Sequence, residues 1–95
     1  MNELKRFTLE FSTDMTEIQA ITMKSDDEMT DARKNTLDDA IKYRTSVSNV
    51  SSVRKDLYRQ GLSDAEVDER SGSILKFAKV TAIKTQDATK IITTA

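Results

Sequence analysis

The run Leu57-Tyr58-Arg59-Gln60-Gly61-Leu62-Ser63-Asp64-Ala65-Glu66 marks the end of one helix and the start of another. Gly61 suits the position just past a helix, where a left-handed conformation lets the chain close off the last carbonyl groups. Ser63, followed three residues later by Glu66, has the pattern of a capping box, and Asp64 adds a favourable negative charge to the first turn. The run therefore predicts a turn between two helices.

The segment before this turn, residues 30–60, is predicted to be one long helix. Its apolar side chains alternate spacings of three and four residues, which places them on one stripe. A 3.5-residue period drifts by about 20° per heptad on a straight helix, so the stripe implies left-handed, coiled-coil winding against a neighbouring helix. The predicted seam consists of Ala40, Tyr43, Val47, Val50 and Leu57, with Arg54 in the one missing position.

The segment after the turn, residues 63–90, is predicted to be a second helix. A break or kink is expected at Gly72, since glycine costs a helix ~1 kcal/mol relative to alanine. Beyond Gly72, apolar and small side chains fall within an arc of roughly 160°. Ile74 and Phe77 lie on that face and join the predicted seam, which either packs the helices of one chain or joins copies of the chain.

Residues 2–24 fit two kinds of secondary structure. At period two, apolar and polar side chains alternate around Leu9 as in a strand, but a hairpin turn near Asp14 lacks the Asn-Gly or Asp-Gly pair that tight turns prefer. At heptad spacing, Asp14 is the single misfit in an apolar stripe made of Leu4, Phe7, Phe11, Ile18 and Ile21. We expect a helix, with a β-hairpin as the alternative.

Together these segments predict an all-α protein and a single domain over residues 1–95. The expected architecture is an antiparallel hairpin of two long helices with the N-terminal segment packed on it. The chain has no proline and only two glycines, which favours long helices over turn-rich β structure. An apolar fraction of 37% makes a thin core, and small proteins of this kind often gain stability by self-association, so we expect an oligomer.

The composition excludes most enzyme chemistry. The chain has neither cysteine nor histidine, which removes thiolate catalysis, zinc–cysteine sites, the commonest general base and the commonest transition-metal ligand. No glycine-rich phosphate loop is present. The acidic run Ser25-Asp26-Asp27-Glu28 lacks the spacing of a calcium loop and fits the start of a helix. We therefore expect no enzyme activity, and no catalytic, cofactor-binding or metal-binding residue.

The run Gly61–Ser73 resembles the DNA-binding helix–turn–helix of repressor-type proteins, in which a recognition helix follows a glycine turn into the major groove. It departs from that family at Asp68, where a small buried residue is usual, at Ser71, where an apolar residue is usual, and at Ala78. The resemblance implies nucleic-acid binding by residues 61–90, although ordinary solubilising charge is the alternative. The candidate phosphate contacts are Arg70, Lys76, Lys79, Lys84 and Lys90.

The leading hypothesis is a non-enzymatic helical binding protein. It would act as an oligomeric inhibitor, adaptor or regulator through protein–protein contacts, and would be of the kind that phages or plasmids encode. Two alternatives stay open: a nucleic-acid-binding regulator that uses residues 61–90, and an oligomer that captures a small phosphorylated ligand with its lysines. The net charge is −1 and no apolar run approaches the ~20 residues of a membrane span, so we expect a cytoplasmic protein without membrane contact.

Overall fold

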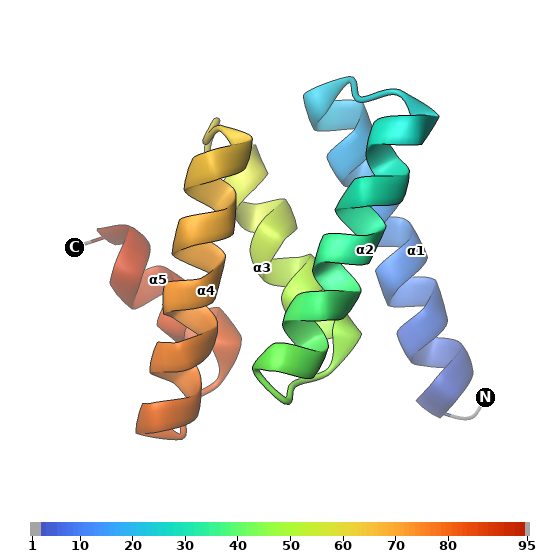
Figure 1. The fold of residues 1–95 in the computed structure, drawn as a ribbon. Helices are drawn as coiled ribbons and strands as arrows, with labels where there is room; N and C mark the ends of the chain where they lie inside the picture. The colour runs from blue at the N-terminus through green and yellow to red at the C-terminus, as the bar shows by residue number, and fades with distance from the viewer. Residues whose placement is uncertain (1–2, 95) are drawn as a thin grey trace.

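A computed structural model of the chain describes the backbone of residues 3–94 and the side chains of residues 9–93 (Figure 1). The described residues form helices and no strand, which confirms the predicted all-α class and excludes the N-terminal β-hairpin. The helices are α1 (Glu3–Thr22), α2 (Asp26–Lys42), α3 (Val47–Arg59), α4 (Asp64–Thr81) and α5 (Thr85–Thr94).

Helix α3 lies at the centre of the molecule and contacts each of the other four helices. Its most extensive partner is α1, and α5 packs on both α4 and α3. In Figure 1, α2 and α4 both run opposite to α3 and lie in front of it. The N-termini of α2 and α4 therefore lie at one end of the molecule, and their C-termini lie at the other.

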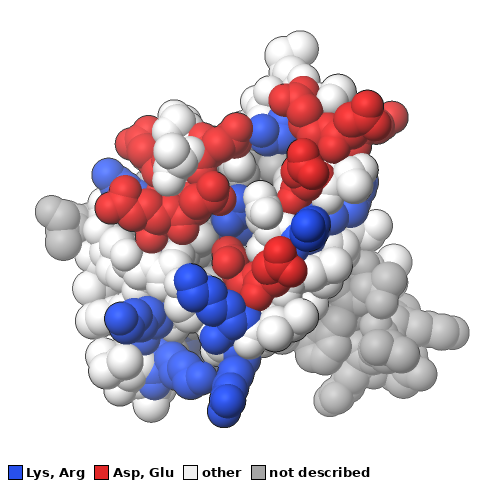
Figure 2. All heavy atoms as spheres, viewed as in Figure 1, with Lys and Arg blue, Asp and Glu red and all other residues white. Residues whose placement is uncertain are grey.

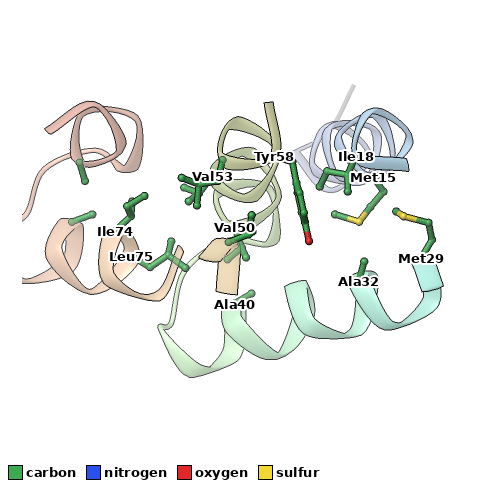
Figure 3. Packing of buried hydrophobic residues seen from close by; sticks show 14 residues of the cluster. Met15, Ile18, Met29, Ala32, Ala40, Val50, Val53, Tyr58, Ile74 and Leu75 are labelled. Carbon is green, nitrogen blue, oxygen red and sulfur yellow. The ribbon is translucent and has the colours of Figure 1, made fainter. Parts of the chain in front are cut away.

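The core follows α3. Its apolar side chains Val50, Val53 and Leu57 are each at most 2% exposed. Figure 3 shows Val50 and Val53 between labelled side chains of α4 on one side and labelled side chains of α1 and α2 on the other. Fully burying a side chain of this size contributes roughly 1.5–3 kcal/mol, so burial against α3 holds the bundle together. The remaining buried apolar side chains are Met15, Ile18, Met29, Ala32, Ala40, Tyr58, Val67, Ile74, Leu75, Ala78 and Ala88.

Residues 30–60 do not form one helix, contrary to the prediction, because the chain turns at residues 43–46. Arg44 adopts the left-handed conformation with φ 52°. The N–H groups of Arg44 and Thr45 donate to carbonyls in the last turn of α2 at 3.3 and 3.0 Å. This is the Schellman closure that usually requires glycine. Ser46 then caps α3 by accepting a hydrogen bond from an amide of its first turn at 3.1 Å.

The predicted second helix, residues 63–90, also divides, but at Ala82 rather than at Gly72. Ala82 is left-handed with φ 58°, and the N–H group after it donates to a carbonyl in the last turn of α4 at 3.1 Å. Gly72 stays inside α4, where an added Cβ would lie 2.8 Å from the Tyr43 hydroxyl oxygen. Because Gly72 has no side chain, the Tyr43 ring can approach α4 closely. The helix does not break at this glycine. The expected hairpin of two long helices is accordingly wrong.

The turn predicted at Gly61 is confirmed. Gly61 has φ 83°, its N–H donates to the Tyr58 carbonyl at 2.9 Å, and the next N–H donates to the Leu57 carbonyl at 3.5 Å. Ser63 and Glu66 form the capping box, with the Glu66 N–H donating to the Ser63 hydroxyl at 3.3 Å and the Ser63 N–H donating to the Glu66 carboxylate at 3.1 Å. The Ser63 hydroxyl also donates to this carboxylate, at 3.0 Å, and the two bonds that Ser63 donates lower the pKa of Glu66 below its usual value.

The N-terminal segment is a helix, as expected, and its apparent misfit has a structural role. Asp14 is 7% exposed, accepts a hydrogen bond from the Ser51 hydroxyl at 2.7 Å and pairs with the Lys55 ammonium at 3.0 Å. The buried carboxylate therefore ties α1 to α3. Leu4 and Phe7 of the predicted stripe lie outside the described side chains.

Candidate functional site

The directions of α2 and α4 separate the charges of the molecule into two ends. Both helices carry acidic residues in the first turn and a lysine in the last turn. Figure 2 shows acidic side chains gathered at the end where these helices begin, and basic side chains gathered at the opposite end. Negative charge at a helix N-terminus and positive charge at a C-terminus both stabilise the helix, so part of this separation serves folding.

Arg54 is the centre of a buried polar network between α2, α3 and α4. The residue is 3% exposed, and its guanidinium group donates to Asp68 at 2.6 Å, to Asp39 at 3.4 Å and to the Ser71 hydroxyl at 3.5 Å. Asp68 and Ser71 are two of the positions at which the sequence departs from the repressor helix–turn–helix. Both departures therefore have a structural cause, because these polar groups bind the arginine.

A groove of about 250 Å³ opens beside Arg54 at the acidic end. In its wall, Asp64 accepts hydrogen bonds from the Lys24 ammonium at 2.9 Å and from the Tyr58 hydroxyl at 2.7 Å. These bonds lower the pKa of Asp64, while burial and the bond to Asp64 raise the pKa of Tyr58 to about 12. Across the described part of the chain, no three acidic side chains are grouped so as to hold a metal ion. Two ion pairs, Lys24 with Asp64 and Arg54 with Asp68, lie within the lining of this groove.

A second groove, of about 240 Å³, lies at the basic end, where α2 passes into α3 and α4 passes into α5. Three exposed cations line it: Arg44, Lys79 and Lys84. The Lys79 ammonium donates to the Tyr43 carbonyl at 3.5 Å. No acidic residue is among the described residues of the lining, whose polar side chains also include Thr45, Asn49 and Thr85.

Two further cations extend this groove onto the surface. The Lys42 ammonium lies 5.3 Å from the centre of the Tyr43 ring, and Lys76 precedes Lys79 by one turn on the exposed side of α4. None of the ion pairs between described side chains involves these cations. We call the set the basic surface, and it consists of Lys42, Arg44, Lys76, Lys79 and Lys84.

The structure divides the cations that the sequence singled out as phosphate contacts. Lys76, Lys79 and Lys84 belong to the basic surface. Arg70 lies instead toward the acidic end of α4, where its charge helps to lower the pKa of a neighbouring glutamate. Lys90 lies on α5 and is not among the described residues that line the basic groove.

Lys42 and Arg44 were not among the cations predicted from the sequence to contact phosphate. Both stand in residues 30–60, which were predicted to be one uninterrupted helix. The break between α2 and α3 has no glycine and no proline to announce it. Two weaker signals were present: Ser46, a residue type that often caps a helix start, and the weak helix propensity of the serine-rich run that follows.

The predicted seam packs helices within one chain. Its buried members, each at most 6% exposed, are Ala40, Val50, Leu57 and Ile74. Its partly buried members, packed against the same core, are Tyr43, Val47 and Phe77. Packing within one chain accounts for this seam. The prediction of an oligomer then rests on the thin core alone.

A third cavity, of about 370 Å³, lies between α1, α3 and the start of α5. The ion pair of Asp14 with Lys55 forms part of its wall. Within the described side chains, no buried nitrogen or oxygen lacks a hydrogen-bond partner. The buried polar atoms in the wall of this cavity are therefore already hydrogen-bonded.

Comparison of the chain with protein-family models, with curated proteins and with solved structures finds no match. Among the described residues, no helix combines the length and the apolar character needed to cross a bilayer.

Proposed function

We propose that the protein is a non-enzymatic binding protein that engages the phosphate backbone of nucleic acid through the basic surface. The observation that carries the proposal is the meeting of Arg44, Lys79 and Lys84 around one groove without an acidic residue in its described lining. Lysine and arginine neutralise phosphates without reading the base sequence. We expect binding that is largely independent of sequence and that falls steeply with salt.

Helix dipoles account for only part of the basic surface. Lys42 and Lys79 stand in the last turns of α2 and α4, where a cation stabilises a helix. Arg44 and Lys84 lie outside the helices, in the two segments that border the groove. Stabilisation of helix ends therefore does not account for Arg44 and Lys84. Their position at one groove supports a role in binding an anion.

The size of the groove favours an extended polymer over a small phosphorylated ligand. Pockets for small ligands usually measure about 300–1,000 Å³, and the basic groove measures about 240 Å³. Lys42 and Lys76 lie beyond its described lining. A polymer with a phosphate at every nucleotide reaches cations both inside and outside the groove.

In the proposed complex, nucleic acid lies at the C-terminal end of α4. The run that resembles a helix–turn–helix, Gly61–Ser73, lies at its N-terminal end. The first turns of α4, which would enter the major groove in that family, carry four acids. Negative charge there repels a phosphate backbone. These acids are Asp64, Glu66, Asp68 and Glu69.

The test is fluorescence anisotropy with a labelled single strand of about 16 nucleotides and the matching duplex, over about 50–200 mM salt. Full use of the five cations predicts a log–log salt slope of about −3.5 for the single strand and −4.5 for the duplex. Replacing Lys79 and Lys84 with Gln should weaken binding and reduce the magnitude of the slope by about 1.4 and 1.8 respectively.

Arg70→Gln is the matched control, because Arg70 is an exposed cation of α4 outside the basic surface. It should leave both affinity and slope nearly unchanged. Absence of salt-dependent binding by the parent protein refutes the proposal, as does an equal loss in the control and in the Lys79/Lys84 variant.

A protein partner is the second candidate, and it has one specific structural support. Leu37 and Ile41 on α2 are 45% and 77% exposed, although both are large apolar side chains. Exposed apolar groups that lie together mark contact surfaces more often than isolated ones do. Association through these two residues is separable from anion binding at the basic groove.

A further inference from the structure

The basic groove adjoins the third cavity, which lies between α1, α3 and the start of α5. Asn49 and Thr85 line both the groove and the cavity, so these two residues form the border between them. Lys84 of the basic surface directly precedes Thr85 in the chain. A phosphate that Lys84 binds therefore lies beside the third cavity.

The lining of the third cavity offers hydrogen-bonding groups that the fold does not use. The side chains of Thr13, Ser52 and Gln86 are exposed or half-buried, and none of them bonds to another described group. The amide nitrogen of Asn49 donates to the Thr45 hydroxyl at 3.0 Å, which leaves the amide oxygen of Asn49 as an acceptor. Amides and hydroxyls supply both donors and acceptors, as the edges of nucleobases require.

The charges of the third cavity suit a base and not a phosphate. Lys55 is the one cation in its described lining, and its ammonium is already paired with Asp14 at 3.0 Å. Glu10 adds a carboxylate, which repels a phosphate but accepts a hydrogen bond from the amino group of a base. Leu9, which is 56% exposed, supplies an apolar contact for the flat face of a base.

We propose that the third cavity binds a base of a single-stranded nucleic acid whose phosphates lie on the basic surface. This inference rests on the proposed function and adds the class of nucleic acid to it. The cavity measures about 370 Å³, which lies within the range of about 300–1,000 Å³ that is usual for small-ligand pockets. The bases of a duplex are stacked and paired, and turning one outward costs free energy. The bases of a single strand are already accessible.

The first test uses three probes in fluorescence anisotropy at one salt concentration. They are a single strand of about 16 nucleotides, the matching duplex, and a strand of the same length made only of abasic sites. Phosphate contacts alone favour the duplex, because its charge is denser. We expect the single strand to bind about tenfold more tightly than the abasic strand, with the same salt slope, and more tightly than the duplex.

The second test removes one unused group of the cavity. Gln86→Ala should weaken binding of the single strand about three- to tenfold and leave binding of the abasic strand unchanged. The salt slope should not change, because no cation is lost. Gln60→Ala is the matched control, because Gln60 is also an exposed glutamine and lies at the far end of α3, outside the cavity. It should leave the binding of both strands unchanged.

The outcomes separate this inference from the proposed function. Equal affinity for the base-bearing and the abasic strand overturns the inference and leaves phosphate binding by the basic surface intact. Tighter binding of the duplex than of the single strand, or equal effects of Gln86→Ala and Gln60→Ala, also overturns it. Absence of salt-dependent binding to every probe overturns both the inference and the proposed function.

Discussion

Removing the buried guanidinium of Arg54 is the sharpest test of how the bundle is held together. Arg54→Met keeps a long side chain between α2, α3 and α4 but deletes the hydrogen bonds to Asp68 at 2.6 Å and Asp39 at 3.4 Å. Ser71 keeps a partner, since its hydroxyl also donates to the Asp68 carbonyl at 3.3 Å. The loss is therefore concentrated in two carboxylates that no longer have a cation.

Breaking a buried ion pair from one side typically costs about 3–5 kcal/mol. The side chains of Asp39 and Asp68 are 24% and 56% exposed, and water screens the second strongly, so we expect the lower figure of about 2–3 kcal/mol. For a domain of this size, that lowers the melting temperature by roughly 10–20 °C. The measurement is urea unfolding followed by circular dichroism at neutral pH.

The penalty should shrink in acid. Burial raises the pKa of Asp39, and the charge of Arg54 opposes that rise. Without Arg54 the pKa of Asp39 in the folded chain rises further above its unfolded value, so protonation favours the folded state and stability is regained as the pH falls through the raised pKa. Unfolding curves at two pH values, one near neutral and one near 5, measure this difference.

Arg59→Met is the control, because Arg59 pairs with Glu17 at a site where its side chain is 53% exposed. We expect a loss below about 1 kcal/mol there. Replacing Arg54, Asp39 and Asp68 together by apolar residues should recover most of the stability, since no unpaired charge is then buried. An Arg54→Met variant as stable as the parent, or no more affected than Arg59→Met, would refute the assignment of Arg54 as a structural centre.

Three further changes test local features of the fold. Ala82→Gly should stabilise the protein by about 0.5–1 kcal/mol in urea unfolding, because it relieves a left-handed alanine, while Ala65→Gly inside α4 should destabilise it by a similar amount. Gly72→Ala alone should gain little stability, because the added methyl group meets the Tyr43 hydroxyl. In a Tyr43→Phe background the same substitution should stabilise the protein by about 1 kcal/mol. A double-mutant cycle that shows no coupling between the two positions would contradict their close approach. Because the pKa of Tyr58 is raised from 10.0 to about 12, the unfolded chain ionises first. Stability should therefore fall as the pH rises from 10 toward 12, by up to about 1.4 kcal/mol per pH unit, and Tyr58→Phe should remove that part of the loss.

The sequence was informative where a glycine and a capping box stand together at the junction of two helices. The turn after α3 was predictable from Gly61, Ser63 and Glu66, because glycine and the capping box act through local hydrogen bonds. The helix ends at Arg44 and Ala82 use the same closure on ordinary residues, so no residue type signalled them. In these cases tertiary packing offsets the free-energy cost of the left-handed conformation. A local sequence pattern does not show this packing.

Part of the candidate site was predictable from the sequence, and the part that was missed depends on the unpredicted turn after α2. Lys79 and Lys84 were found because a basic region is visible in composition. Arg44 reaches the groove only because the chain turns after α2, so a missed turn became a missed site residue. Asp14 and Arg54 were exceptions to apolar stripes, and both proved to be buried, paired charges.

The most direct test of the proposed binding surface is a titration of the ¹⁵N-labelled protein with a short single-stranded oligonucleotide, followed by amide chemical shifts. Salt-sensitive shift changes should concentrate at residues 42–45 and 76–85, which border the basic groove, and should be lost when Lys79 and Lys84 are replaced by Gln. Changes centred on residues 61–73, the part of α4 that resembles a recognition helix, would contradict the account. So would an unchanged spectrum at low salt.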